Sequence, residues 1–313
     1  MSVDPTRDAV VSWLLEGDPA IRWQVMRDLL GADEAEWRQE QQRVAREGWG
    51  AELLSHRDES GRWTPRLYGR KWISTTYSLV LLRRFGLPRH DPRAIESTLL
   101  FFEEAMGMDG GIDVSSRRIG SEMCITAMAV ALFYWFEVDD PRREVVLEAL
   151  LDRQLPDGGW NCSRPSKHGS FHTTASAMEA MRECALSLTP DVPGEITAAE
   201  EAGRRFLLAH RLFRSHRTGE VVNEQFLRFS FPPRWHYDVL RGLDLFWSAG
   251  RLDDPLLEEA IEVVKAKRRS DGRWRLQQRW PGETWFEMET VGEPSRWNTL
   301  RAMRVLEGWG AGK

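Results

Sequence analysis

Apolar residues recur along this chain in blocks of roughly fifty residues, and each block holds two helix-like segments. One segment of each block is apolar on all sides, as expected of a helix that is surrounded by other helices. Six such segments align on one column of residues, which consists of Trp23, Ser74, Cys124, His172, His236 and Trp297. Because the column returns at spacings of 51, 50, 48, 64 and 61 residues, the chain is expected to stack six copies of one unit.

The second segment of each block is amphipathic, with apolar residues about 3.6 positions apart and one polar face. Pro92, Pro141 and Pro255 each follow an aspartate, which is the N-cap and first-turn pattern of a helix start. These polar segments are predicted to be outer helices over residues 6–16, 33–46, 92–106, 141–154, 197–212 and 255–269.

Glycine turns separate the two segments of five blocks, at Gly61, Gly110, Gly158, Gly219 and Gly272. Three of these glycines follow an aspartate, and Asp-Gly is a strong turn signal. The chain therefore reads as six helical hairpins. The first and last apolar segments resemble each other and neither end has a polar cap, so we expect a closed ring rather than an open solenoid. The predicted fold is all-α, an α/α toroid (α6/α6 barrel) that forms one domain over residues 1–313.

Composition and charge indicate which partners and which cellular location to expect. The chain has 313 residues, 42% of them hydrophobic, which is enough to bury a large core. A net charge of -5 argues against nucleic acid, which needs a concentrated excess of Lys and Arg. The longest apolar run, 127–136, is about half the length needed to span a bilayer, and the first residues lack a secretory signal pattern. A cytoplasmic protein without a transmembrane segment is therefore expected.

Cysteine and tryptophan usage adds two expectations. Three cysteines at irregular spacing offer no disulfide framework, so their roles are those of thiols, ligands or core residues. Fifteen tryptophans exceed ordinary usage in a chain of this length, and each aromatic side chain has a large apolar surface to bury. Either the core or a large cavity is expected to be lined with them.

Short motifs connect this repeat to a known superfamily. The string QLPDGGW at 154–160 resembles the QW motif of squalene cyclases, and 60–63 and 271–274 are partial copies without the glutamine. Together with the repeat, these motifs resemble the terpenoid cyclases and the protein prenyltransferase β-subunits. The resemblance implies an α/α toroid that acts on an isoprenoid or other apolar substrate in a central cavity. On the prenyltransferase side it also implies a partner subunit.

The prenyltransferase resemblance further implies a metal site. Those subunits bind zinc through Asp-x-Cys at the start of one inner helix and a histidine at the start of the next. Here Glu122 and Cys124 stand at the first position and His172 at the second. Thiolate, imidazole and carboxylate all suit Zn²⁺, and either Cys162 or His236 would be a fourth ligand. Core packing is the alternative interpretation of the cysteines.

The polar and aromatic residues at the predicted inner-helix starts form the candidate site, since two histidines there would converge on one mouth of the ring. The expected catalytic residues are His172, His236, Asp238 and Glu122. Trp72, Trp235 and Trp297 are expected to bind substrate with their aromatic faces, together with Arg117 and Arg118 near the position of the family's diphosphate-binding residues.

Two carboxylates lie on segments that are predicted to be buried, Asp238 and Glu179, and a buried carboxylate needs a partner. Arg241, Arg301 and Arg304 are the available cations on inner helices. A structural ion-pair network and a pair of catalytic carboxylates are both consistent with this pattern.

Three functional hypotheses follow. The first is an enzyme that resembles the prenyltransferases and terpenoid cyclases and acts on an isoprenoid-like ligand, with or without zinc. The second is a non-catalytic toroid that binds a hydrophobic ligand. The third is a glycan-processing enzyme, because α/α toroids also host sugar chemistry between stacked tryptophans and two carboxylates.

Overall fold

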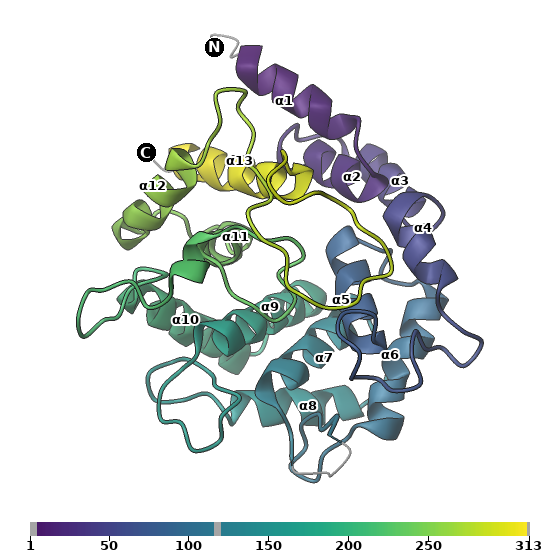
Figure 1. Cartoon of the computed structure of the whole chain (residues 1–313). Coiled ribbons are helices and arrows are strands. Elements are labelled where there is room, and N and C mark those ends of the chain that lie inside the picture. The colour runs from purple at the N-terminus through teal and green to yellow at the C-terminus, as the bar shows by residue number, and fades with distance from the viewer. Residues whose placement is uncertain (1–4, 116–119, 312–313) are drawn as a thin grey trace.

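The structure of the protein is a computed structural model that describes residues 5–115 and 120–311. Within these residues the chain is a ring of α-helices around one centre, the predicted α/α toroid (Figure 1). The inner helices pack on one another in sequence order, and the last of them returns to the first. They are α2 (Pro19–Asp28), α5 (Thr75–Phe85), α7 (Met123–Trp135), α9 (Phe171–Leu188), α11 (Val239–Ser248) and α13 (Arg296–Ala311).

The outer helices surround this ring and pair with the inner ones as hairpins. They are α1 (Pro5–Leu15), α3 (Glu34–Arg43), α4 (Gly48–Ser55), α6 (Pro92–Glu104), α8 (Arg142–Leu151), α10 (Gly194–Ala209) and α12 (Glu258–Ala266). Their burial follows the predicted pattern. Inner helix α7 is buried on all sides from Ile125 to Tyr134, whereas outer helix α6 buries one face only. The predicted division into inner and outer helices is therefore confirmed, except that two outer helices, α3 and α4, follow α2 where one helix over 33–46 was predicted.

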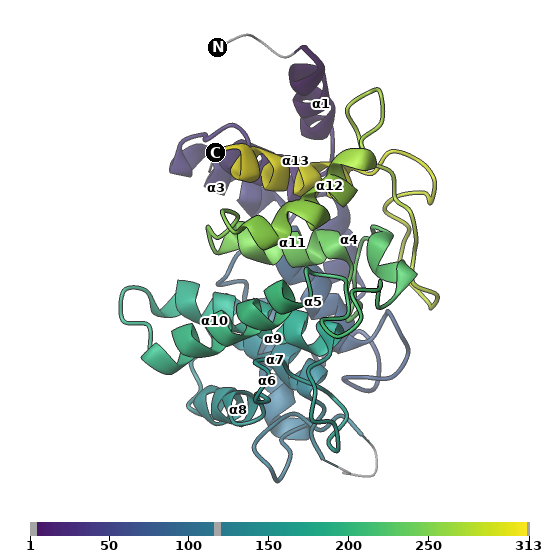
Figure 2. The ribbon, with the colours of Figure 1, turned by 90° about the vertical axis from the view of Figure 1, so that its left-hand side faces the viewer.

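The glycine turns have the backbone conformation that their sequence indicates. Gly61, Gly110, Gly158, Gly219 and Gly272 all adopt a positive φ between 74° and 85°. This left-handed conformation is costly for residues with a Cβ atom. The long segments that contain these turns lie on one side of the ring, and the short connections back to the outer helices lie on the other (Figure 2). The inner-helix starts therefore share one side of the ring.

A tryptophan two positions after three of these glycines fixes each hairpin internally. The indole N–H groups of Trp63, Trp160 and Trp274 donate to the carbonyls of Leu53, Leu150 and Val264, each ten residues earlier and at or near the end of the preceding outer helix. The backbone N–H of each tryptophan donates to a threonine hydroxyl on the following inner helix. The tryptophan thus links the two helices of its own hairpin. The ring of Trp160 also lies close to Gly203 of α10, in the next hairpin.

The glutamine and glycine of the motif also make contacts between adjacent hairpins. The amide of Gln154 donates to the carbonyl of Ala199 on the next outer helix at 2.9 Å. Gly158 lies so close to that helix that a Cβ atom would be 2.3 Å from the carbonyl oxygen of Ala202. Gly272 approaches Thr6 of α1 in the same way, so the last hairpin packs on the first.

Polar contacts also close the ring between α13 and α2. The guanidinium of Arg304 donates to Asp28 at 2.9 Å and to Gln24 at 3.2 Å. On the outside, Arg7 pairs with Glu307 at 2.9 Å. Closure therefore rests on paired charges as well as on apolar packing.

The segment 276–295 crosses one mouth of the ring before α13 begins (Figure 1). Its far end is held beside α5, where the indole of Trp72 donates to the carbonyls of Trp280 and Pro281. The side chains of Arg70 and Glu283 form an ion pair at 2.6 Å. This mouth lies at the inner-helix starts and is covered. None of the described helices has the length and apolar character required to cross a membrane.

Candidate functional site

Four of the predicted aromatic and histidine site residues, His172, His236, Trp72 and Trp235, gather at the covered mouth. The fifth, Trp297, stacks on Phe231 and Phe85 instead. The ring of His236 stacks between Trp235 and Trp280, with centroid distances of 3.7 and 3.4 Å. His172 contacts the same group edge-on, 5.8 Å from His236, and Trp72 lies 6.1 Å from His236. The sequence therefore placed these side chains together correctly, although their use by a substrate stays a prediction.

Both histidines are held in the neutral state. Burial, with a smaller contribution from the charge of Arg241, lowers the pKa of His172 to about 4. Burial followed by the charges of His172, Arg241 and Lys71 lowers the pKa of His236 to about 3. The Nδ1 atom of His172 accepts the backbone N–H of Tyr237 at 2.8 Å, so its proton is on Nε2.

The expected zinc ligands do not form a metal site. The backbone N–H of Cys124 donates to the sulfur of Cys162 at 3.1 Å. Hydrogen bonds, chiefly from the Cys124 thiol, lower the pKa of Cys162 to about 7. His172 uses Nδ1 for a backbone hydrogen bond. In residues 5–115 and 120–311 no three His, Cys, Asp or Glu side chains are grouped so that they would hold a metal ion, so Glu122, Cys124 and His172 do not fit zinc.

Asp238 is fully buried and serves as the N-cap of α11. One carboxylate oxygen accepts the backbone N–H of Arg241 at 2.8 Å. The other accepts the backbone N–H and the hydroxyl of Ser230 at 3.0 and 2.8 Å. Both oxygens are thus occupied by local contacts. Arg117 and Arg118 lie outside the described residues.

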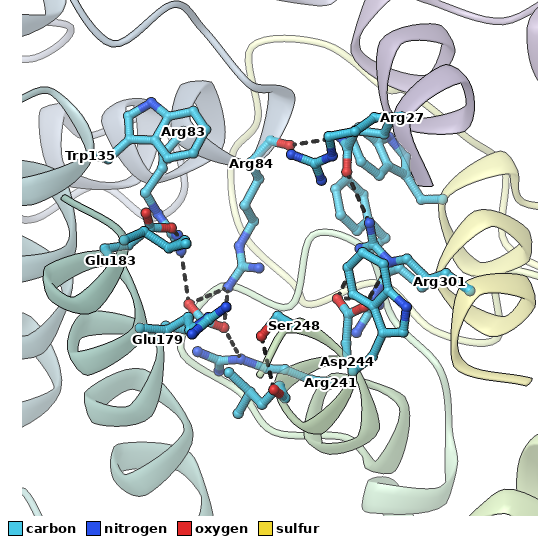
Figure 3. Close-up of a pocket in the computed structure, with 18 of the residues that line it drawn as sticks. Arg27, Arg83, Arg84, Trp135, Glu179, Glu183, Arg241, Asp244, Ser248 and Arg301 are labelled. Atoms are coloured by element: carbon cyan, nitrogen blue, oxygen red, sulfur yellow. Dashed lines mark hydrogen bonds and ion pairs between the residues drawn. The ribbon is translucent and has the colours of Figure 1, made fainter. Parts of the chain in front are cut away.

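A pocket with a volume of about 200 Å³ lies at the centre of the ring, toward the carboxyl ends of the inner helices, and Figure 3 shows most of its lining. All of the inner helices contribute to it, which places it on the axis of the toroid. We call it the central pocket. Its lining comprises Trp23, Gln24, Arg27, Arg83, Arg84, Trp135, Glu179, Arg182, Glu183, Leu186, Phe231, Arg241, Asp244, Leu245, Trp247, Ser248, Trp297, Arg301 and Arg304.

Glu179 of α9 organises one wall of this pocket. Its carboxylate accepts from Arg83, Arg84 and Arg241 at 2.8 to 2.9 Å, as Figure 3 shows. Burial alone would raise the pKa of Glu179, but the three guanidinium charges outweigh burial and hold that pKa well below its usual range. Arg83 also pairs with Glu183 at 2.7 Å. This Glu179 cluster contains three arginines and two carboxylates.

Asp244 of α11 organises the opposite wall (Figure 3). Its carboxylate accepts from Arg304 at 2.8 Å and lies 3.5 Å from Arg301. Arg27 and Arg304 also pair with Asp28, which stands behind the lining. This Asp244 cluster contains three arginines and two carboxylates. The predicted ion-pair network is thus present, although Arg304 pairs with Asp244 and Asp28 rather than with Asp238 or Glu179.

Positive charge exceeds negative charge in the central pocket. Seven arginines and three carboxylates line it, and Asp28 behind the lining supplies a fourth carboxylate. Arg182 of α9 contributes to this excess, since it forms no ion pair with another described residue. Burial lowers the pKa of Arg84 to about 10, which leaves its guanidinium charged at neutral pH.

Several N–H donors of the lining are buried without an acceptor. They are the Nε atoms of Arg83, Arg84 and Arg182 and the indole Nε1 of Trp297. Buried donors in folded proteins are usually paired, and an unpaired one is costly. Donors of this kind around one pocket are suited to an acceptor that enters from solution.

Arg234 adds positive charge in the interior. Its side chain is 6% exposed, has no carboxylate partner among the described residues, and lies over the ring of Trp72 at 5.4 Å. Burial, together with the charge of Arg84, lowers the pKa of Arg234 to about 9, although the charge of Tyr77 would raise it.

Most of the central pocket was not predicted from the sequence. Of its lining, Glu179, Arg241, Arg301 and Arg304 were predicted as ion-pair residues and Trp297 as a substrate-binding aromatic residue. Arg83, Arg84, Arg182 and Asp244 were not predicted. The sequence did contain an indication of this site. Charged residues on helices that are otherwise apolar need partners inside the ring, so they could have been predicted to lie together there.

Comparisons with known proteins give a likeness in structure only. No family model and no curated protein matches the chain. A crystal structure of a protein from Actinoplanes matches with a TM-score of 0.49 and 17% identity over 97% of this chain and 99% of that one. A variant of the type II terpene cyclase MstE from Scytonema, in complex with geranylgeranyl dihydroxybenzoate, matches with a TM-score of 0.49 and 16% identity over 98% and 97%. Neither likeness bears on the ligand of this chain.

Proposed function

We propose that this protein binds a small anionic ligand with an apolar portion in its central pocket. The observation that carries the proposal is the excess of arginine over carboxylate, with unpaired guanidinium and indole N–H donors in the same lining. Phosphate and carboxylate oxygens accept such donors in charge-assisted hydrogen bonds. Because the site is partly desolvated, each of these hydrogen bonds contributes more to the binding free energy there than it would on the surface.

Aromatic rings account for the apolar portion of the ligand. Trp23, Trp135, Trp247, Trp297 and Phe231 line the same pocket as the arginines. The rings of Trp297 and Phe231 stack on each other, with their centroids 4.0 Å apart. A short isoprenoid-like or aromatic group with an anionic head would satisfy both kinds of lining. This ligand class sharpens the predicted isoprenoid-like ligand by adding a negative charge.

The charge state of the pocket favours binding over acid catalysis. A cyclase that starts by protonating its substrate needs a carboxyl group that is neutral before the reaction. The pKa of Glu179 is held far below its usual range, so this carboxyl is ionised and already shared among three arginines. We therefore propose a binding protein. This agrees with the second functional hypothesis, a non-catalytic toroid that binds a hydrophobic ligand.

Octyl phosphate and octanol are a matched pair of probes, because they share a chain and differ in charge. We expect octyl phosphate to change the tryptophan fluorescence saturably, since four tryptophans line the pocket, and octanol to bind more weakly. Added salt should weaken the binding of octyl phosphate but not that of octanol, because ions screen the charge of the phosphate. Equal affinities for the two probes would contradict the proposal.

Arg182→Gln removes one pocket charge that has no ion-pair partner. Loss of a hydrogen bond to a charged group costs about 1.5–3 kcal/mol, so the Kd for octyl phosphate should rise roughly ten- to hundredfold. The control is Arg205→Gln on α10, where the arginine is 65% exposed and outside the pocket. The control should bind as wild type does, and an equal loss in both variants would show that general surface charge is responsible.

A further inference from the structure

Cys124 and Cys162 lie in contact at the covered mouth of the ring, outside the central pocket. The backbone N–H of Cys124, in the first turn of α7, donates to the sulfur of Cys162 at 3.1 Å. The hydroxyl of Thr173 adds another donor at 3.5 Å. The sulfur of Cys162 thus receives donors from two helices.

This arrangement distinguishes the pair from the third cysteine. The start of a helix, with a backbone N–H and a hydroxyl directed at the sulfur, favours the negative charge that develops on sulfur when a cysteine reacts. Both paired thiols are partly exposed, whereas Cys184 is fully buried within α9. A small oxidant in solution would therefore meet the pair before it met Cys184.

We propose that Cys124 and Cys162 are an oxidation site, where a hydroperoxide converts the two thiols to a disulfide. In the first step the thiolate of Cys162 attacks one peroxide oxygen. A sulfur–oxygen bond forms, the oxygen–oxygen bond breaks, and the leaving alkoxide or hydroxide takes up the proton that Cys162 released. Cys162 is oxidised to the sulfenic acid, and the peroxide is reduced to an alcohol or water.

In the second step Cys124 attacks the sulfenic sulfur of Cys162. The sulfur–sulfur bond forms, the sulfur–oxygen bond breaks, and hydroxide leaves with the proton of Cys124 as water. The sulfurs have to move from hydrogen-bonding contact to the bonded distance of about 2.05 Å. The product would tie the start of α7 to the segment that leads into α9. This oxidation is independent of ligand binding in the central pocket.

Intact-mass analysis after hydrogen peroxide treatment and alkylation under denaturing conditions tests this proposal on the full chain. The reduced protein has three thiols to alkylate, and the treated protein should have one, with a loss of two hydrogen atoms. Cys184→Ser is the matched control, and it should lose both remaining thiols to the same intramolecular disulfide. Retention of all three thiols, or a disulfide that includes Cys184, would overturn the proposal.

Single variants assign the two roles. Cys124→Ser should stop at the sulfenic acid of Cys162, which dimedone would trap. In Cys162→Ser, Cys124 should stay alkylatable under the same treatment. Circular dichroism before oxidation checks that both variants are folded. Dimedone labelling of Cys124 in place of Cys162 would contradict the assignment, as would disulfide formation in either variant.

Discussion

At the scale of single residues, the surroundings of a side chain decide what chemistry it can perform. His172 and His236 have the residue type of an acid–base pair, but burial keeps both neutral. A glutamic acid can donate a proton when it is neutral, but three guanidinium groups keep Glu179 ionised. These states favour a site that recognises charge over one that transfers protons.

The protonation of His172 gives a pH dependence with a definite sign. Burial, aided by the charge of Arg241, lowers the pKa of His172 to about 4 in the folded chain, whereas an unfolded histidine titrates near pH 6.5. The unfolded state therefore binds more protons between these values, so stability that is present above about pH 6.5 is lost as the pH falls toward 4. We expect His172 to account for a loss of roughly 2 kcal/mol between pH 7 and pH 5.

Urea unfolding of the wild type and of His172→Asn at both pH values measures this contribution. Asparagine keeps an acceptor for the N–H of Tyr237 and does not titrate, so the variant should lose less stability on acidification. His168→Asn is the control, because His168 is exposed. Identical pH dependence in the wild type and His172→Asn would show that the titration of His172 does not contribute.

At the scale of elements, each hairpin is built from a glycine turn and the groups that follow it. The glycine provides the left-handed backbone, and at Gly158 and Gly272 it also allows a close approach to the neighbouring outer helix. In three hairpins a tryptophan joins the outer helix to the inner one. The repeated residues therefore serve the assembly of the ring, which is why their spacing predicted the fold.

Alanine substitutions at two turns separate backbone strain from contact between hairpins. Gly158 and Gly219 have similar φ angles, 85° and 74°. A Cβ atom at Gly158 would be 2.3 Å from the carbonyl oxygen of Ala202, whereas at Gly219 it would have no neighbour within 4 Å. Gly219→Ala should cost about 1–2 kcal/mol from strain alone.

Gly158→Ala should cost a further 1–3 kcal/mol, about what overpacking costs in a well-packed core. Thermal unfolding of the two variants measures the difference. Equal melting temperatures would mean that the approach of the turn to α10 contributes nothing to stability.

At the scale of the whole molecule, ring closure brings residues from opposite ends of the chain into one pocket. Arg304 of the last inner helix pairs with Asp28 of the first, and both α2 and α13 line the centre. An open solenoid would lack this ion pair between α13 and α2. Closure and the central pocket are thus consequences of the same contacts.

Arg304→Met tests the contribution of closure to stability. It would leave Asp28 paired with Arg27 and Asp244 paired with Arg301, but it would remove the cation that joins the two carboxylates, and breaking a buried pair costs up to about 3–5 kcal/mol. Glu307→Gln alters an exposed ion pair between the first and last hairpins and should cost less than about 1 kcal/mol. Urea unfolding checks both values. Similar small losses in the two variants would show that the interior pairs do not hold the ring together.

The fold was predictable from the sequence to a greater extent than the site. Hairpin turns recur because every hairpin needs the same backbone geometry, and so Gly158 and Trp160 have counterparts throughout the chain. The central pocket has no such repeat, because each helix contributes different residues to it. Arg84 and Asp244 acquire their role only when six helices meet, so the prediction concentrated on the repeated inner-helix starts instead.

The central claim, that the middle of the ring is an anion site, is tested most directly by crystals grown with selenate. This tetrahedral dianion can be located from its anomalous scattering. We predict a selenate peak in the central pocket, within hydrogen-bonding distance of the Arg84 or Arg182 guanidinium. Selenate on exposed arginines such as Arg205, with no peak between the Glu179 and Asp244 clusters, would contradict the claim.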